Sequence, residues 1–215
     1  MKEQRMFWFS VAVCLTLFIV IGFSSQILPA NSSDSLAIIS AKPNSDYNQT
    51  FEELGMGVVY DFQMTLPQAD ETWVKIWVDA YQSGKEIQSN PVGVLSYGLS
   101  PNEYEEGHIG LALVEEEGGN PLLVLYAPGV KTLPSQLSIP LDIVAGGNIT
   151  DYAIGMEDIH LTEGETKLLA VHRTVKDSAH LMDWNDATAR QTMIQESETA
   201  LLLKIKVAKE MPETK

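Results

Sequence analysis

Apolar and polar residues alternate along most of the chain from about residue 51 onward. The segment 58–66, VVYDFQMTL, places every second side chain from Val58 on one apolar face. Because the side chains of a strand point alternately to its two faces, this period predicts strands with one buried face. The predicted strands lie at 58–66, 72–82, 92–97, 108–115, 122–126, 137–144, 150–154, 159–161, 165–174 and 201–208.

Gly, Pro and Asn fill the gaps between these segments, for example at 118–121 and 146–148. Short strands separated by such turns are typical of β-sandwiches and β-barrels, and the strand–helix alternation of a doubly wound fold is missing. We therefore expect an all-β fold, specifically an antiparallel two-sheet sandwich.

One long segment, 175–197, interrupts the alternation before the last strand. Asn185 or Asp186 is suited to cap a short helix that ends near Gln195. An excursion of this length in a compact domain usually covers or binds something. Two interpretations stay open: a helical cap over one open end of the sandwich, or part of a binding site.

The N-terminal pattern differs from the rest. Residues 6–23 carry no charge and are preceded by a short positive flank at 1–5. An uncharged apolar segment of about 18 residues is close to the shortest helix that crosses a bilayer. Basic residues on its N-terminal side alone predict a cytoplasmic N-terminus, with the remainder outside. We expect a single-pass transmembrane anchor, and a signal peptide cut after Ser24, giving a secreted protein, is the alternative.

This interpretation divides the chain into four parts. A cytoplasmic flank at 1–5 and an anchor or signal segment at 6–28 are followed by a linker at 29–50, which is rich in Ser, Asn, Asp and Pro. The β domain outside the cytoplasm occupies 51–215.

Composition narrows the function classes. The formal net charge of −15 disfavours nucleic acid and anionic lipid headgroups as partners. The only cysteine, Cys14, lies in the apolar segment, so the domain has no disulfide and no thiol nucleophile. An exported domain without disulfides fits a bacterium better than an animal secretory pathway. We expect no cofactor.

The segment 72–82 carries the most informative pattern, because its two faces differ. One face is aliphatic, and the other combines aromatic with charged side chains; the latter are Trp73, Lys75, Trp77, Asp79 and Tyr81. Aromatic rings beside polar groups suit stacking against sugars or anchoring of a protein partner. In the alternative interpretation the segment 175–197 packs over these rings, with Trp184 closing over the face.

Other chemistries find weaker support. The four histidines have no metal-ligand spacing, and no serine elbow or glycine-rich phosphate loop occurs. Asp177, Asp183 and Asp186 are a weak candidate set for calcium, without the spacing of an EF-hand.

The leading hypothesis is a non-enzymatic binding module at the outer face of a membrane, with a cell-wall glycan or another envelope protein as its partner. Trp73, Lys75, Trp77, Asp79, Tyr81 and Trp184 are its candidate ligand-binding residues. The alternatives are a structural or regulatory ectodomain of a membrane complex and a hydrolase with an unrecognised site.

Overall fold

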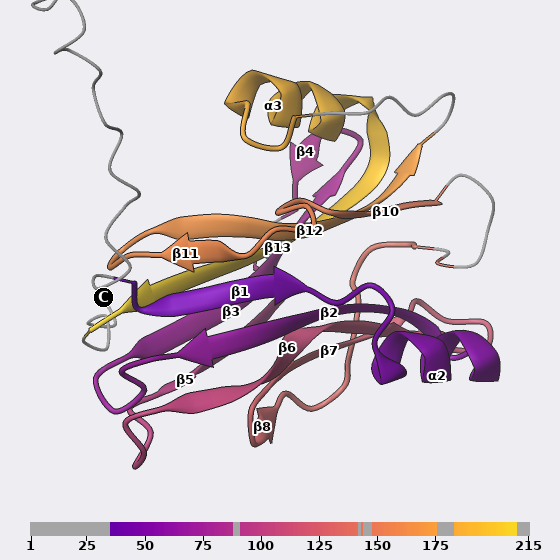
Figure 1. Cartoon of the computed structure of the whole chain (residues 1–215). Coiled ribbons are helices and arrows are strands. Elements are labelled where there is room, and N and C mark those ends of the chain that lie inside the picture. The colour runs from indigo at the N-terminus through magenta and orange to yellow at the C-terminus, as the bar shows by residue number, and fades with distance from the viewer. Residues whose placement is uncertain (1–34, 88–90, 142, 144–147, 176–182, 210–215) are drawn as a thin grey trace, which may run out of the picture. The chain divides into compact units, whose positions relative to one another are not determined.

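The computed structural model describes residues 35–87, 91–141, 143, 148–175 and 183–209, and consists mostly of strands in two antiparallel sheets (Figure 1). The elements are β1 (Ala37–Ala41), α2 (Asp46–Leu54), β2 (Gly57–Leu66), β3 (Trp73–Gln82), β4 (Lys85–Glu86), β5 (Gly93–Gly98), β6 (Glu105–Val114), β7 (Leu122–Ala127), β8 (Val130–Lys131), β9 (Ser135–Gln136), β10 (Asn148–Tyr152), β11 (Ile159–Leu161), β12 (Thr166–Val175), α3 (Ala187–Glu196) and β13 (Ser197–Ala208).

The two sheets are stacked over one shared core. The seven-stranded sheet has the order β11-β1-β2-β6-β7-β8, with β9 also paired to β7. The six-stranded sheet has the order β10-β12-β13-β3-β4, with β5 also paired to β3. Phe62 and Ile109 from the first sheet and Ile76 and Leu203 from the second lie in the same buried cluster. Period-two patterning therefore produces the expected all-β sandwich, because each sheet buries one apolar face against the other.

The predicted strand at 137–144 is wrong as a strand. Within its described part, 137–141 and 143, no residue joins a sheet. Leu137, Ile139, Leu141 and Ile143 are nevertheless buried. Their alternation therefore reflects burial of every second side chain without sheet pairing. Pro140, which lies between them, has no N–H to donate to a neighbouring strand.

Part of the stretch predicted as a linker, 29–50, holds regular structure. β1 pairs with both β2 and β11, and α2 begins after Ser45, whose hydroxyl accepts from the Asn48 N–H. Gly55 ends α2 in the left-handed conformation, with φ of 60°. Residues 34–215 form one compact unit, so the folded domain begins before residue 51.

The expected membrane-spanning segment at 6–28 lies outside the described residues. Among the helices that are described, none has the length and apolar character needed to span a bilayer.

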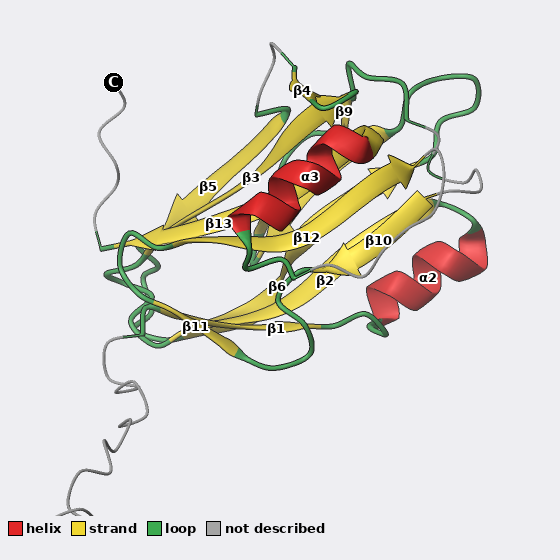
Figure 2. Ribbon diagram, turned by 90° about the horizontal axis from the view of Figure 1, so that it is seen from above, coloured by secondary structure: helices red, strands yellow, loops and turns green. Residues whose placement is uncertain are grey.

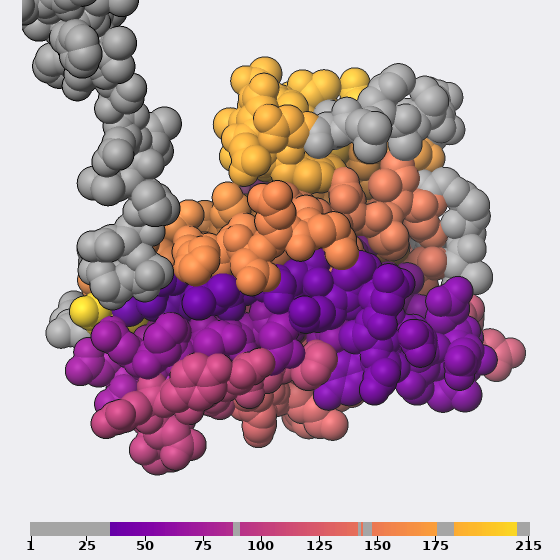
Figure 3. All heavy atoms as spheres, in the orientation of Figure 1, coloured from indigo at the N-terminus to yellow at the C-terminus, as the bar shows by residue number. Residues whose placement is uncertain are grey.

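Helix α3 confirms the expected helix before the last strand, and Asp186 caps it by accepting from the N–H groups of Thr188 and Ala189. The helix lies across the outer face of the six-stranded sheet, over β12 and β13, and does not close an end of the sandwich (Figure 2). In Figure 3 it forms a ridge above that sheet.

Candidate binding site on the outer face of the six-stranded sheet

The two faces of β3 divide as the alternation predicts. Val74, Ile76 and Val78 are buried in the core. The five side chains on the opposite face, Trp73, Lys75, Trp77, Asp79 and Tyr81, are all partly exposed. They lie on the outer face of the six-stranded sheet, between β13 on one side and β5 on the other.

Polar contacts already engage two of these side chains. The Lys204 amine lies 2.7 Å from Asp79 Oδ2, and neither side chain is more than 25% exposed. The Lys75 amine lies over the Trp77 ring, 5.3 Å from its centroid, which is a favourable cation–π geometry. Asp79 therefore positions Lys204, and the Trp77 ring attracts the positive charge of Lys75.

Helix α3 covers only part of this face. Its two buried side chains, Met193 and Ile194, pack on Val171, Ala200 and Leu202. Tyr81 and Trp184 pack against the edge of the same apolar cluster.

Trp184 is held in place by one polar contact of its ring and one of its backbone. Its indole Nε1 donates to Asp151 Oδ2 over 2.6 Å, which ties the ring to β10. Its backbone carbonyl oxygen accepts from Arg190 Nη1 on α3. A ring fixed to the sheet, on a backbone fixed to the helix, loses little conformational freedom on binding a ligand.

A groove with a volume of about 520 Å³ runs between α3 and the sheet. Tyr81, Trp184 and Leu168 supply aromatic and apolar surface to its lining. Burial, followed by the negative charges of Asp79 and Glu86, raises the pKa of Tyr81, so its phenol keeps its proton at neutral pH.

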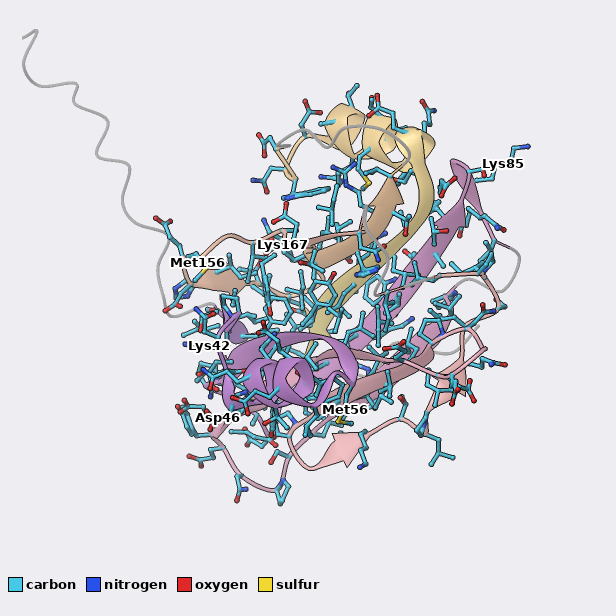
Figure 4. All side chains as sticks on the ribbon, turned by 90° about the vertical axis from the view of Figure 1, so that its right-hand side faces the viewer. Lys42, Asp46, Met56, Lys85, Met156 and Lys167 are labelled. Carbon is cyan, nitrogen blue, oxygen red and sulfur yellow. The ribbon has the colours of Figure 1, made fainter. Side chains whose placement is uncertain are left out.

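More basic than acidic side chains line the groove, although the chain as a whole is acidic. Three basic side chains, Lys167, Arg190 and Lys204, line it together with one acidic side chain, Glu165. Figure 4 labels Lys167 on the sheet below α3, where its amine lies 3.4 Å from Asn185 Oδ1. Because Lys204 is paired with Asp79, Lys167 and Arg190 are the cations of the lining that favour an anionic ligand.

The groove brings together only some of the predicted ligand-binding residues. Tyr81 and Trp184 line it, and Asp79 acts on it through Lys204. Trp73, Lys75 and Trp77 lie on the same sheet face but do not line the groove.

Sequence reasoning missed the basic residues of the groove. Lys204 occupies the polar face of the last predicted strand, but nothing local indicates that it lies opposite Trp77 in the sheet. Arg190 and Lys167 are brought to the groove from α3 and β12 by packing of the helix on the sheet.

The weak calcium candidates are engaged in local structure. Asp183 Oδ1 accepts from the Asn185 N–H over 2.9 Å, and Asp186 caps α3. Asp177 lies outside the described residues. In the part of the chain that the structure describes, no group of three or more His, Cys, Asp or Glu side chains is arranged to hold a metal ion.

Comparison with known proteins gives no match: no family model, no curated protein and no solved structure matches this chain.

Proposed function

We propose that this chain is a binding module whose ligand is an anionic glycan, bound in the groove between α3 and the six-stranded sheet. The observation that carries the proposal is one groove with two aromatic rings and three basic side chains, on a chain whose net charge is strongly negative. The role proposed for these side chains is recognition of the ligand.

The side chains of the groove suit a sugar with acidic groups. The rings of Tyr81 and Trp184 offer flat apolar surface for the C–H face of a sugar ring, and each has a polar group at its edge. Arg190 and the two lysines supply charge-assisted hydrogen bonds to carboxylate or phosphate oxygens. The negative charge elsewhere on the chain repels such a ligand, which favours binding at this groove.

The proposed location of the module is the outer face of a membrane. The uncharged segment 6–23 and the basic residues before it support an N-terminal membrane anchor, which would display the domain outside the cytoplasm. A charged glycan of the cell envelope is then the ligand within reach.

A second candidate is a protein partner on the part of the sheet face beyond the groove. Val94 of β5 is 42% exposed and is paired across the sheet with Trp77, so an apolar and aromatic patch lies open there. This alternative corresponds to a structural or regulatory ectodomain.

The test is a calorimetric titration of residues 34–215 with oligosaccharides of matched length. The charged panel contains oligogalacturonate, hyaluronan fragments and a phosphate-bearing polyol oligomer, and the neutral panel contains cello- and galacto-oligosaccharides. We expect saturable binding of at least one charged ligand, weakened by salt, and affinities at least about 10-fold lower for neutral ones.

Variants locate the binding. Trp184→Ala and Lys167→Gln should each weaken the charged ligand about 10-fold, since each removes one stacking or charge-assisted contact. Trp73→Ala, on the same face but outside the groove, is the matched control and should bind normally. Failure of every charged ligand, or equal loss with Trp73→Ala, would overturn the assignment to this groove.

A further inference from the structure

The outer face of the seven-stranded sheet buries a carboxylate that the proposed function does not use. Asp61 points to the side of β2 opposite Tyr60 and Phe62, yet it is 0% exposed. A buried carboxylate is costly unless hydrogen bonds satisfy both oxygens. Here Oδ2 lies 2.8 Å from His108 Nδ1, and Oδ1 accepts from the Tyr126 hydroxyl over 2.9 Å.

A glycine makes this arrangement possible. In the sheet register Gly110 of β6 stands directly between Asp61 of β2 and Tyr126 of β7. A Cβ atom on Gly110 would lie 2.5 Å from the Tyr126 hydroxyl oxygen and closer still to the Tyr60 carbonyl oxygen. The missing side chain therefore leaves room for the phenol to reach across β6 to the carboxylate.

The carboxylate fixes the tautomer of His108. A carboxylate accepts hydrogen bonds and donates none, so the proton of the neutral imidazole lies on Nδ1. Nε2 then carries a lone pair and acts as an acceptor. The His108 side chain is 41% exposed, and within the described residues no hydrogen bond engages Nε2.

His108 lines a second groove, with a volume of about 570 Å³. Its lining also includes Tyr47 and Phe51 of α2, Val124 of β7 and Pro128 in the turn before β8. In Figure 4 α2 faces the viewer between the labelled Asp46 and Met56. Tyr47 contacts His108 edge to face, with ring centroids 5.0 Å apart.

We infer that this groove is a second ligand site, which binds a small aromatic molecule through a hydroxyl group on its ring. The apolar and aromatic walls bury the ring of the ligand, and its hydroxyl donates to His108 Nε2. Selectivity follows from the tautomer. A bound ligand without a hydroxyl group would shield His108 Nε2 from water and leave it without a hydrogen bond. The site lies on the other sheet from the α3 groove, so failure of one proposal does not affect the other.

The probe is 2-naphthol, and 2-methoxynaphthalene is the matched ligand that keeps the ring but has no donor. Residues 34–215 labelled with ¹⁵N at histidine are titrated with each at pH 8.5, where imidazoles are generally neutral. We expect the ¹⁵N resonances of His108 to show an Nδ1–H tautomer and its Nε2 resonance to shift with 2-naphthol alone. The affinity for 2-methoxynaphthalene should be about 3- to 10-fold lower, the worth of one neutral hydrogen bond.

A variant pair completes the test. His108→Phe keeps a ring of similar size and should reduce the affinity for 2-naphthol to that of 2-methoxynaphthalene. His160→Phe, at an exposed position of β11, should change neither affinity. Equal affinities of the parent chain for the two ligands, or an unchanged His108 resonance, would overturn the inference. Both measurements are made on the parent chain, so they do not depend on whether a variant folds.

Discussion

His172 shows how burial changes the chemistry of a single residue. Its Nδ1 lies 3.0 Å from the Tyr60 hydroxyl oxygen, and that hydroxyl lies within hydrogen-bond distance of the Val171 carbonyl oxygen. Its Nε2 has no hydrogen-bond partner among the described residues. Burial disfavours the charged imidazolium and lowers the pKa of His172 to about 4.

This shift predicts a loss of stability in acid. An imidazole in an unfolded chain titrates near pH 6.5, so below about pH 6.5 the unfolded state binds a proton that the native state refuses until about pH 4. The free energy of unfolding should fall through this window by about 3 kcal/mol in total and should be unaffected above it. Urea denaturation at pH 7.5 and pH 4.5 measures the fall.

The contribution of His172 is separated from that of the carboxylates by variants. His172→Phe should lose less stability than the parent chain between these two pH values, whereas His160→Phe, changed at an exposed site, should lose as much as the parent. An identical acid response of His172→Phe and the parent would contradict this role of His172.

At the scale of elements, α3 is attached to the sheet by few apolar contacts. Only Met193 and Ile194 of this helix are buried, and burial of such side chains stabilises by about 1.5–3 kcal/mol each. The capping contacts of Asp186 are therefore a sizeable part of what holds α3, and with it the groove, in place.

Loss of this cap should loosen the groove without unfolding the sandwich. Asp186→Ala removes two hydrogen bonds at the start of α3 and should destabilise the helix by about 1 kcal/mol. We expect faster hydrogen exchange in α3 and unchanged exchange in β2 and β6. Ser45→Ala, which removes the equivalent cap of α2, should leave exchange in α3 unchanged; equal exchange in Asp186→Ala and the parent would argue against the cap.

The elements differ in how well the sequence predicts them. Strands with one buried face, such as β2 and β3, follow from their period of two. Helix α2 does not, because it is short and its apolar side chains, Tyr47, Phe51 and Leu54, are few and none of them is fully buried. β1 is only five residues long and lies in a polar stretch.

The candidate sites depend on partners that are distant in sequence. Asp79 and Lys204 form an ion pair across β3 and β13, and Asp61 reaches His108 and Tyr126 on β6 and β7. Each of these residues appears in the sequence as an ordinary polar position of a strand. Only the register of the sheets brings them together, and register is set by the whole fold.

At the scale of the whole molecule, residues 34–215 form one compact unit, and the membrane anchor at its N-terminal side is a proposal. An anchor would make the full chain and the domain behave differently. Expressed in bacteria, the full chain should sediment with membranes and resist extraction by alkaline carbonate, while residues 34–215 should stay in the supernatant. A product in the supernatant with the mass of residues 25–215 would instead indicate cleavage after Ser24.

The central claim is that ligand binds beside Trp184 under α3. It is tested most directly by tryptophan fluorescence of residues 34–215, in which Trp73, Trp77 and Trp184 are the only tryptophans. One variant, Trp73→Phe with Trp77→Phe, reports on the groove alone, and Trp184→Phe reports on the remainder of the sheet face. On titration with the charged oligosaccharide that binds tightest, the account predicts a saturable change in the first variant and little change in the second. A response confined to the second variant would contradict it and place the ligand on the open face around Trp73 and Trp77.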